Sequence, residues 1–368
     1  MDNPKKILIV VPFFTLGGAE TQAVNVAVAL KKAGHTVQVL AFEKKNGILI
    51  DKLVSLKLEH KLYPFDLGIL HKGGIKKFIK ILLLGKFVRS LKVDYLFPFT
   101  YYPNLLTSLI WRFTGAKKCF WNQRGLEKIG VSKIEILAKL MKPDYIANSN
   151  VCAEFIVKRH EIELSKVQVI RNGVNNEGLN KKSSWDEIEK ITKDKLVFSM
   201  VANFYPEKKH INMLKAWSEA TNNDPSKLLI FVGYSPNDIH ILKAKGIAYD
   251  LQLKNVLFLP SSNDIGSLLR NTDVGVLISE SEGCPNSVLE YMQYSLPVIA
   301  SDIPAIVEVF DSQNPLLSDY NDIEGFTASI KKCDDESFRL KLGKLNNQLV
   351  NSRYSLDELS SNYIKLVC

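Results

Sequence analysis

The feature of the sequence that most constrains its fold is a regular alternation of short apolar runs with longer amphipathic segments. Residues 5–14, KKILIVVPFF, form an apolar run of the length typical of a strand buried on both faces. A glycine pair breaks this run, and residues 19–34 then have the spacing of a helix ending at Gly34. A second apolar run, HTVQVLAF, follows, so we expect a right-handed βαβ unit.

The alternation continues to about residue 174, stops over a polar stretch at 176–194, and restarts with KLVFSMVANF. A chain of 368 residues also suits two domains. We therefore predict the α/β class, with Rossmann-like, doubly wound parallel-sheet domains at 1–172 and 173–353. We expect a C-terminal helix, at about 354–368, to pack back on the first domain. Ligands should bind in a cleft at the carboxyl ends of the strands.

The composition is that of an ordinary globular protein, with 46% apolar and 24% charged residues. The most apolar cluster, FIKILLLGKFV, contains two lysines and is too short to span a bilayer. No signal-peptide pattern is found at the N-terminus. The five cysteines are scattered, without a C-x-x-C or a Cys/His cluster. We expect a cytoplasmic protein with reduced thiols, without a zinc site and without a cofactor.

The charge is distributed unevenly along the chain. Residues 1–175 hold 28 Lys and Arg against 13 Asp and Glu, whereas the remainder holds 20 against 26. This asymmetry indicates an anionic partner for the first half, either nucleic acid or a membrane surface. The alternative is a basic face that is merely solvated.

The glycine pair Gly17-Gly18 follows the first predicted strand and precedes a helix. Glycines there allow backbone to approach a ligand closely, and the positive end of the helix points to the same place. The pair does not belong to a G-x-G-x-x-G pattern, and the chain has no G-x-x-x-x-G-K-[ST], which excludes a nucleotide-hydrolysing P-loop. Taken alone, such a pair is more often a simple turn.

A second motif is SESEGCPNSVLEYMQYSLPVIAS, residues 279–301. Pro285 suits the first position of a helix, whose free amides would form an anion site. These amides belong to Asn286, Ser287 and Val288. Glu282 would lie on one side of a bound phosphate and Glu290 on the other, where each can accept hydrogen bonds from hydroxyls. The spacing fits a sugar–diphosphate–ribose ligand, and the alternative is a plain surface helix.

SEGCPNSVLEYMQYSLPVIASD resembles the E-G-F-P-N-x-x-L-E-A-M-x-x-G-x-P-V-V-A-[ST]-D signature of glycosyltransferase family 4. FTLGGAE, ANSNVCAEFIV, VIRNGVN, VANFYPEKKHINMLKAW and LRNTDVGVLIS resemble further family segments, in order along nearly the whole chain. The resemblance implies the GT-B fold, with an acceptor-binding first domain and a donor-binding second domain. It implies retaining transfer from a nucleotide-diphosphate sugar, during assembly of a bacterial surface polysaccharide such as O-antigen or capsule.

The resemblance also implies roles for single residues. Glu282 would bind the transferred sugar, and Glu290 the ribose. Lys208 would neutralise the diphosphate, which Gly17-Gly18 would approach through backbone N–H groups. The nucleotide, with UDP expected rather than GDP, would place its base at Leu259, Pro260 and Ser261. The remaining donor-binding positions are Asn203, Gly283, Cys284, Pro285, Asn286, Ser287 and Val288. No metal is required by this scheme.

Several positions depart from the family pattern. Asn203 stands where the family has an arginine, so a positive charge is missing, and Arg124 in WNQRG is a candidate to replace it. Cys284 replaces an aromatic residue, and Tyr291 and Ser295 replace a small residue and a glycine. The histidine that often follows the fourth strand is absent from FPFTYYPN. The acceptor side would then be formed by Thr100, Tyr101, Asn104 and Arg124.

Two segments of the first half combine apolar and basic residues, at 101–118 and 76–92. Either can contact an anionic membrane surface, which would bring the enzyme to a lipid-linked or oligosaccharide acceptor. The alternative, a sheet-covering helix with solvated lysines, is preferred for 76–92 and is equally supported for 101–118. The expected location is the inner face of the cell membrane.

Two rival functions remain. A nucleotide-sugar epimerase has the same fold, but it converts its substrate without an acceptor. A nucleic-acid-binding protein is suggested by the pI near 9.1, yet the recognition signatures of such proteins are missing. We therefore expect no nucleic-acid partner.

Overall fold

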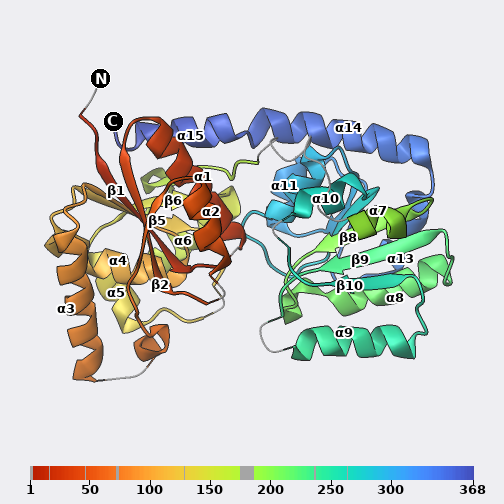
Figure 1. Cartoon of the computed structure of the whole chain (residues 1–368), viewed down its shortest axis with the longest axis horizontal. Helices are drawn as coiled ribbons and strands as arrows, with labels where there is room; N and C mark the ends of the chain where they lie inside the picture. The colour runs from red at the N-terminus through yellow and green to blue at the C-terminus, as the bar shows by residue number, and fades with distance from the viewer. Residues whose placement is uncertain are drawn as a thin grey trace. The chain divides into compact units, whose positions relative to one another are not determined.

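The chain folds into two compact units of the α/β class (Figure 1). The first contains residues 1–173 and 356–368, and the second contains residues 174–355. The computed structural model describes residues 3–15, 17–45, 47–71, 74–127, 129–174, 186–235, 238–262 and 264–368. The first unit thus ends one residue after the boundary expected from the sequence, and the chain returns to it at Leu356.

The first unit contains a seven-stranded parallel sheet in the order β3-β2-β1-β4-β5-β6-β7. Its strands are β1 Lys6–Phe13, β2 Thr36–Glu43, β3 Glu59–Leu62, β4 Tyr95–Pro98, β5 Lys118–Gln123, β6 Asp144–Ala147 and β7 Val167–Val169. The strand order reverses between β1 and β4. In open parallel sheets, ligands bind at the carboxyl ends of the strands beside such a reversal.

Helices cover both faces of this sheet because each presents an apolar stripe to it. On one face are α3 Ile75–Ser90, α4 Tyr101–Thr114, α5 Lys133–Leu140 and α6 Asn150–His160. On the other face are α1 Gly18–Lys32, α2 Ile48–Ser55 and α15 Leu356–Lys365. The C-terminal helix α15 packs beside α1 through Leu359 and Tyr363, which are four residues apart and buried (Figure 1).

The second unit contains a six-stranded parallel sheet in the order β10-β9-β8-β11-β12-β13, which reverses between β8 and β11. Its strands are β8 Leu196–Val201, β9 Lys227–Val232, β10 Val256–Leu259, β11 Val274–Leu277, β12 Val298–Ser301 and β13 Leu317–Ser318. Its helices are α7 Asp186–Thr192, α8 His210–Thr221, α9 Ile239–Asp250, α10 Ile265–Arg270, α11 Asn286–Gln293, α12 Pro304–Phe310, α13 Ile323–Lys332 and α14 Glu336–Arg353. Separate apolar clusters lie on the two faces of the sheet, so the predicted doubly wound α/β class is confirmed for both units.

Two helix starts differ from the sequence-based prediction. Helix α4 begins at Tyr101 rather than at residue 104, because Pro103 falls in the first turn, where its missing N–H removes no helical hydrogen bond. Pro285 is the N-cap of α11, with φ −76° and ψ 102°, and not its first helical residue. Within the described part of the chain, every helix is too short or too polar to cross a bilayer.

Candidate active site

The loops that follow β8 and β11 meet at the reversal point of the second sheet. The N–H of Glu280, after β11, donates to the carbonyl of Glu207, after β8, at 2.9 Å. Glu207 belongs to the short 3-10 helix η3, Pro206–Lys208. Two segments that are more than seventy residues apart in the sequence are therefore joined where a ligand is expected.

Two ion pairs connect the same loops side by side. The ammonium of Lys208 pairs with Glu282, and the ammonium of Lys209 pairs with Glu280. All four side chains are largely buried, with exposed fractions of 13–27%. The residues predicted to hold the diphosphate and the sugar, Lys208 and Glu282, are thus brought into contact. Lys209, which also lies 5.6 Å from the ring centroid of Tyr320, is not a merely solvated lysine.

The loop that carries Glu282 is fixed by a serine pair that sequence reasoning missed. The N–H of Ser279 donates to Oγ of Ser301 at 2.8 Å, and Oγ of Ser279 donates to the carbonyl of Ser281 at 3.1 Å. Both Ser279 and Ser301 are fully buried. Ser301 is the last residue of the neighbouring strand β12. The hydrogen bond from Ser279 therefore fixes the loop after β11 to the end of β12.

Helix α11 starts from this loop and is held against β8 and β11 by Tyr291. The Tyr291 hydroxyl accepts a hydrogen bond from the N–H of Val201 at 2.7 Å and donates to the carbonyl of Val276 at 3.3 Å. A Cβ at Gly275 would lie 2.3 Å from the Tyr291 ring, so the glycine makes room for it. Burial raises the pKa of Tyr291 above its usual range.

A second departure from the family pattern has a backbone explanation. Ser295 has φ 59°, in the left-handed region that glycine adopts most readily. The carbonyl of Ser295 faces Gly343 of α14 so closely that a Cβ there would lie 1.9 Å from it. A serine thus occupies a position whose backbone conformation favours glycine.

The other donor-binding positions surround the same edge of the sheet. Pro285 and Gly283 are buried, whereas Cys284, Asn286, Ser287 and Glu290 are partly exposed. Val288 is fully buried in the apolar cluster beneath the helix, so only its backbone N–H can serve a ligand. Leu259 is the last residue of β10, and Pro260 and Ser261 are exposed immediately after it.

Asn203, which stands in the place of an arginine, is oriented by the loop after β9. Its Oδ1 accepts a hydrogen bond from the N–H of Tyr234 at 3.0 Å. Gly233 allows β8 and β9 to approach here, since a Cβ on it would lie 2.0 Å from the carbonyl oxygen of Ala202. The Asn203 amide oxygen thus has a partner within the unit.

His210, the first residue of α8, lies close to Lys208 but belongs to the core. Its ring stacks on Phe204 with centroids 4.2 Å apart, and it is 6% exposed. Burial, with help from the charge of Lys208, lowers the pKa of His210 to about 3. The imidazole is therefore neutral at physiological pH. Among the described residues no group of three or more His, Cys, Asp and Glu side chains gathers as metal ligands would.

At the reversal point of the first sheet, the glycine pair lies between β1 and α1. Gly17 is the N-cap of α1, with φ −123° and ψ 174°, and Gly18 is its first residue and is exposed. Sequence reasoning missed Glu20, whose side chain folds back over this turn and is only 8% exposed. A Cβ on Gly17 would lie 2.4 Å from Oε2 of Glu20, so a larger residue there would displace the end of this side chain.

Two family models match the chain in succession. The model described as "Glycosyltransferase Family 4" matches residues 16–177, and the one described as "Glycosyl transferases group 1" matches residues 181–349. This chain belongs to the family 4 type of glycosyltransferases. The two matches contain Gly17, Lys208, Glu282 and Glu290, so the predicted family is confirmed across both units.

Curated relatives include an Escherichia coli UDP-Gal:alpha-D-GlcNAc-diphosphoundecaprenol alpha-1,3-galactosyltransferase, which is 28% identical over 64% of this chain and 63% of the relative. An uncharacterized glycosyltransferase of Haemophilus influenzae is 26% identical over 84% of both chains. The Vi polysaccharide biosynthesis protein VipC/TviE of Salmonella typhi is 23% identical, with 74% of this chain and 49% of the relative covered. The match thus spans less than two thirds of the first and third of these relatives.

Solved structures share the fold. A glycosyltransferase from Rickettsia africae has a TM-score of 0.80 at 20% identity, and 99% of this chain and 98% of that chain are covered. Anabaena Alr3699/HepE, solved with UDP and glucose, has a TM-score of 0.83 at 16% identity, and 99% of both chains are covered. Together with the two parallel sheets, these similarities confirm the predicted GT-B fold.

In this family 4-type chain, two of the expected acceptor-side residues are structural. Asn104 is fully buried; its Nδ2 donates to the carbonyl of Asn122 at 2.7 Å, and its Oδ1 accepts from the N–H of Asn122 at 3.0 Å. Tyr101 is 8% exposed and donates to Glu135 at 2.9 Å. Because these groups are already paired inside the unit, we remove Asn104 and Tyr101 from the candidate acceptor site.

Thr100 stays at the reversal point of the first sheet, between β4 and α4, and is partly exposed. Its φ of 72° and ψ of 169° lie in a region that is nearly restricted to glycine, which is unusual for a β-branched residue. Such strain is often kept at functional positions. Thr100 therefore remains a candidate for the acceptor side.

Arg124, the candidate for the missing charge, is held within the first unit. Its Nη1 donates to Oδ1 of Asn172 at 2.7 Å, and its Nη2 donates to the hydroxyl of Tyr363 at 2.6 Å. The guanidinium also lies 4.6 Å from the ring centroid of Phe99. Arg124, just after β5, is thus bonded to Asn172 and to Tyr363 of α15. These bonds give Arg124 a structural role within the first unit.

Glu20 makes the stability of this protein depend on pH. Burial raises the pKa of Glu20 from 4.5 to about 7, against a smaller opposing effect of a hydrogen bond from its own N–H. The folded protein therefore binds this proton more tightly than the unfolded chain, so stability is lost as pH rises from about 4.5 to about 7. Glu20→Gln should be more stable than the parent at pH 8, by at most about 3 kcal/mol, and equally stable at pH 4.

Thermal unfolding of both proteins at pH 4 and pH 8 measures this difference. Glu43→Gln is the control; it removes a partly exposed ion pair with Lys45 and should not be more stable than the parent at pH 8. A melting-temperature difference between Glu20→Gln and the parent that is the same at both pH values would contradict the prediction.

Proposed function

We propose that this protein is a retaining glycosyltransferase that moves a sugar from a nucleoside-diphosphate sugar to a lipid-linked glycan during surface polysaccharide assembly. The observation that carries the proposal is the contact between Lys208 and Glu282 at the reversal point of the second sheet, beside the N-terminus of α11. A cation, a carboxylate and the N-terminus of a helix at one place suit a ligand that joins a diphosphate to a sugar.

The donor would bind by replacing the ion pair. The phosphates take the Lys208 ammonium and the amides at the start of α11, while Glu282 accepts hydrogen bonds from the sugar hydroxyls. Glu290, in the second turn of the same helix, binds the ribose, and the base lies beyond the end of β10 at Leu259. We infer a uridine nucleotide, since the Escherichia coli relative is named for UDP-Gal and HepE was solved with UDP.

Transfer would proceed on one face of the sugar. The bond between the anomeric carbon and the diphosphate oxygen breaks as the acceptor oxygen bonds to the same face, and the acceptor proton passes to the departing phosphate. Lys208 and the positive end of α11 stabilise the charge that develops on this phosphate. Because these groups can do the work of a divalent cation, we propose that no metal takes part.

The acceptor would be a glycan on a lipid diphosphate, at the inner face of the membrane. The support is the name of the Escherichia coli relative, which includes a diphosphoundecaprenol substrate, and the excess of basic residues in the first unit. Thr100 is the residue that we retain for contact with the acceptor; a role of Arg124 there stays a prediction, because its guanidinium already donates to Asn172 and Tyr363. The role that the resemblance gives to Gly17 and Gly18 stays a prediction.

The proposal is tested by incubating the purified protein with UDP-sugars and a polyprenyl-diphosphate-linked sugar, with and without EDTA. We expect acceptor-dependent release of UDP, a product whose anomeric configuration by NMR matches the donor, and unchanged activity in EDTA. Conversion of the UDP-sugar without an acceptor would instead indicate an epimerase. Activity that EDTA abolishes and magnesium or manganese restores would contradict metal independence.

A further inference from the structure

Glu20 places a buried carboxyl group over the turn that precedes helix α1. It is the third residue of the helix, and its side chain is only 8% exposed. The carboxyl folds back over the N-cap, since a Cβ on Gly17 would lie 2.4 Å from its Oε2. The first N–H groups of a helix have no partner within the helix itself. Glu20 therefore lies where these groups and the positive end of the helix dipole would attract an anion.

This carboxyl has no cation as a partner in the described part of the chain. It accepts a hydrogen bond from its own N–H, and no other side chain bonds to it there. The elements that pack with α1 are β1, β2, α2 and α15. Their titratable residues, with the two that end α1 itself, are Lys6, Lys31, Lys32, Glu43, Asp51, Lys52, Asp357, Glu358, Tyr363 and Lys365. None of them contributes to the pKa of Glu20.

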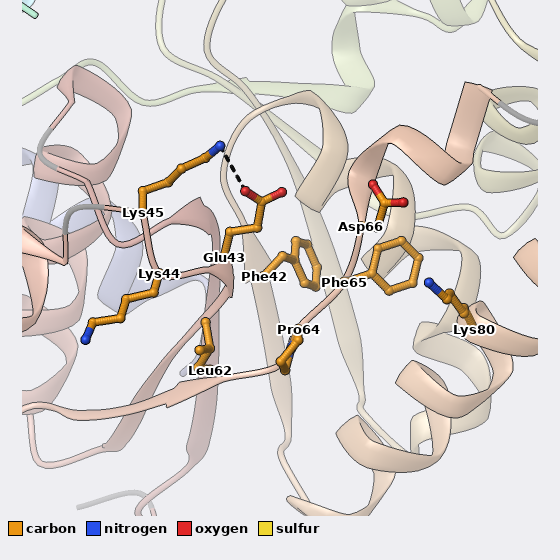
Figure 2. A pocket seen from close by; sticks show the side chains of 9 residues that line it. All are labelled: Phe42, Glu43, Lys44, Lys45, Leu62, Pro64, Phe65, Asp66 and Lys80. Atoms are coloured by element: carbon orange, nitrogen blue, oxygen red, sulfur yellow. Dashed lines mark ion pairs between the residues drawn. The ribbon is translucent and has the colours of Figure 1, made fainter. Parts of the chain in front are cut away.

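A second carboxylate at the same edge of the sheet has the partner that Glu20 lacks. Glu43 ends β2, and Figure 2 shows its carboxylate paired with the ammonium of Lys45 at 2.9 Å. The carbonyl of Glu43 accepts the N–H of Phe14, just before the glycine turn, at 3.1 Å. Two neighbouring strands are thus followed by carboxyl groups, of which Glu43 is ion-paired and partly exposed. Glu43 is therefore a matched control for Glu20.

Burial without a cation makes Glu20 easy to protonate. Removing a carboxylate from water disfavours its charged form, and the pKa of Glu20 is raised from 4.5 to about 7. Both forms are therefore present near neutral pH. The ionised form fills the helix end with negative charge, whereas the neutral acid carries an O–H group that can donate a hydrogen bond.

A phosphate at the glycine turn would compete with the ionised form of Glu20. When two anions share one site, each disfavours the charged form of the other, so the carboxyl binds its proton more tightly. The neutral acid would instead donate a short, charge-assisted hydrogen bond to a phosphate oxygen. A phosphate should therefore bind the protonated form of Glu20 and keep the proton there.

We propose that Glu20 takes up a proton from solvent when the diphosphate of the sugar donor binds at the glycine turn, and that its O–H then donates to a phosphate oxygen. The step depends on the proposed function and on the predicted contact of the diphosphate with Gly17 and Gly18. The proton stays on Glu20 while the nucleotide is bound and returns to solvent when the nucleotide leaves. Donor affinity is thus linked to pH through one residue.

The test compares the binding of UDP by the parent and by Glu20→Gln, which keeps the shape of the neutral acid and cannot ionise. Isothermal titration calorimetry gives both affinities at pH 6 and pH 8. At pH 6, below the pKa of Glu20, the two proteins should bind UDP about equally. At pH 8 roughly nine tenths of Glu20 is ionised, so the parent should bind UDP about tenfold more weakly than the variant. Ionisation of UDP itself affects both proteins alike.

The proton is counted by repeating the titration at pH 8 in buffers that differ in their enthalpy of ionisation. For each UDP bound, the parent should take up about one proton more than Glu20→Gln. Glu43→Gln, the matched control, should keep the pH dependence of the parent. Glu20→Ala cannot ionise either, so it should also lose this pH dependence, and it replaces Glu20→Gln in the titrations if that variant does not fold.

Two outcomes would overturn the proposal. If the parent and Glu20→Gln lose UDP affinity by the same factor between pH 6 and pH 8, the proton is not bound by Glu20. If Glu20→Gln binds UDP more weakly than the parent at both pH values, the ligand needs the ionised carboxylate. In both cases the bound UDP leaves the proposed function standing. A folded parent that binds no UDP at either pH would contradict the proposed function as well.

Discussion

Lys208→Ala is expected to lower the turnover of sugar transfer by a factor of about 10² to 10³, which corresponds to about 3 to 4 kcal/mol of lost transition-state stabilisation. Lys208 follows β8 at the reversal point of the second sheet and contacts Glu282 in the structure. Its charge matters most while negative charge accumulates on the departing phosphate. Turnover should therefore fall by a larger factor than donor affinity, measured by steady-state kinetics and by calorimetric titration with the donor.

Comparison variants distinguish catalysis from structure. Glu290→Gln, at the expected ribose contact, should weaken donor binding at least as much as it lowers turnover. Lys209→Ala breaks the neighbouring ion pair with Glu280. Its turnover therefore shows the effect of losing a contact between the two loops while Lys208 is kept. Lys215→Ala, at an exposed lysine of α8, should resemble the parent. If Lys208→Ala and Lys209→Ala lose the same turnover, Lys208 acts by joining the loops and not by binding phosphate.

Glu135→Ala is expected to destabilise the first unit by about 3 to 5 kcal/mol, the usual cost of removing one partner of a buried ion pair. Glu135 is fully buried and accepts hydrogen bonds from Arg159, at 2.5 and 2.8 Å, and from the hydroxyl of Tyr101 at 2.9 Å. His160 contacts the same carboxylate at 3.0 Å and is itself bonded to Tyr145. Without Glu135, the Arg159 guanidinium would be left in the interior without its carboxylate partner.

The pH dependence of this effect follows from the pKa of Glu135. Burial alone would raise the pKa, but the hydrogen bonds from His160, Arg159 and Tyr101 outweigh burial and lower it to about 2. The stabilisation is therefore complete above the unfolded value of about 4.5 and is lost as pH falls toward 2. The difference between parent and variant in urea unfolding should be large at pH 7 and smaller at pH 3.

The control for this experiment is an exposed pair in the same unit. Glu161, which is 86% exposed, pairs with Lys139 at 3.2 Å, and Glu161→Ala should change the free energy of unfolding by less than about 1 kcal/mol. Glu135→Gln keeps the side-chain volume, and it replaces Glu135→Ala in the unfolding measurement if the alanine variant does not fold. A free energy of unfolding for Glu135→Gln within about 1 kcal/mol of the parent would contradict the role of the network.

The order of strands and helices could be predicted from the sequence because it rests on local patterns. Continuous apolar runs such as ILIVV indicate strands that are buried on both faces, and helices between them require parallel pairing. The segment VANFYPEKKHINMLKAW and the family signature are also local, and from them the sequence predicts site roles for Lys208, Glu282 and Glu290. Both the predicted fold class and the predicted family are confirmed.

Tertiary structure decided what no local pattern contains: which side chains are free to act. Lys208 contacts Glu282 because β8 lies next to β11, and the carboxyl ends of neighbouring parallel strands meet at one edge of the sheet. The same packing buries Asn104 against Asn122, which removes it from the acceptor site, and opens a place for Tyr291 at Gly275. Helix α3 packs one side against the sheet, and the apolar side chains on its other side, such as Ile75, Phe78 and Leu82, are exposed.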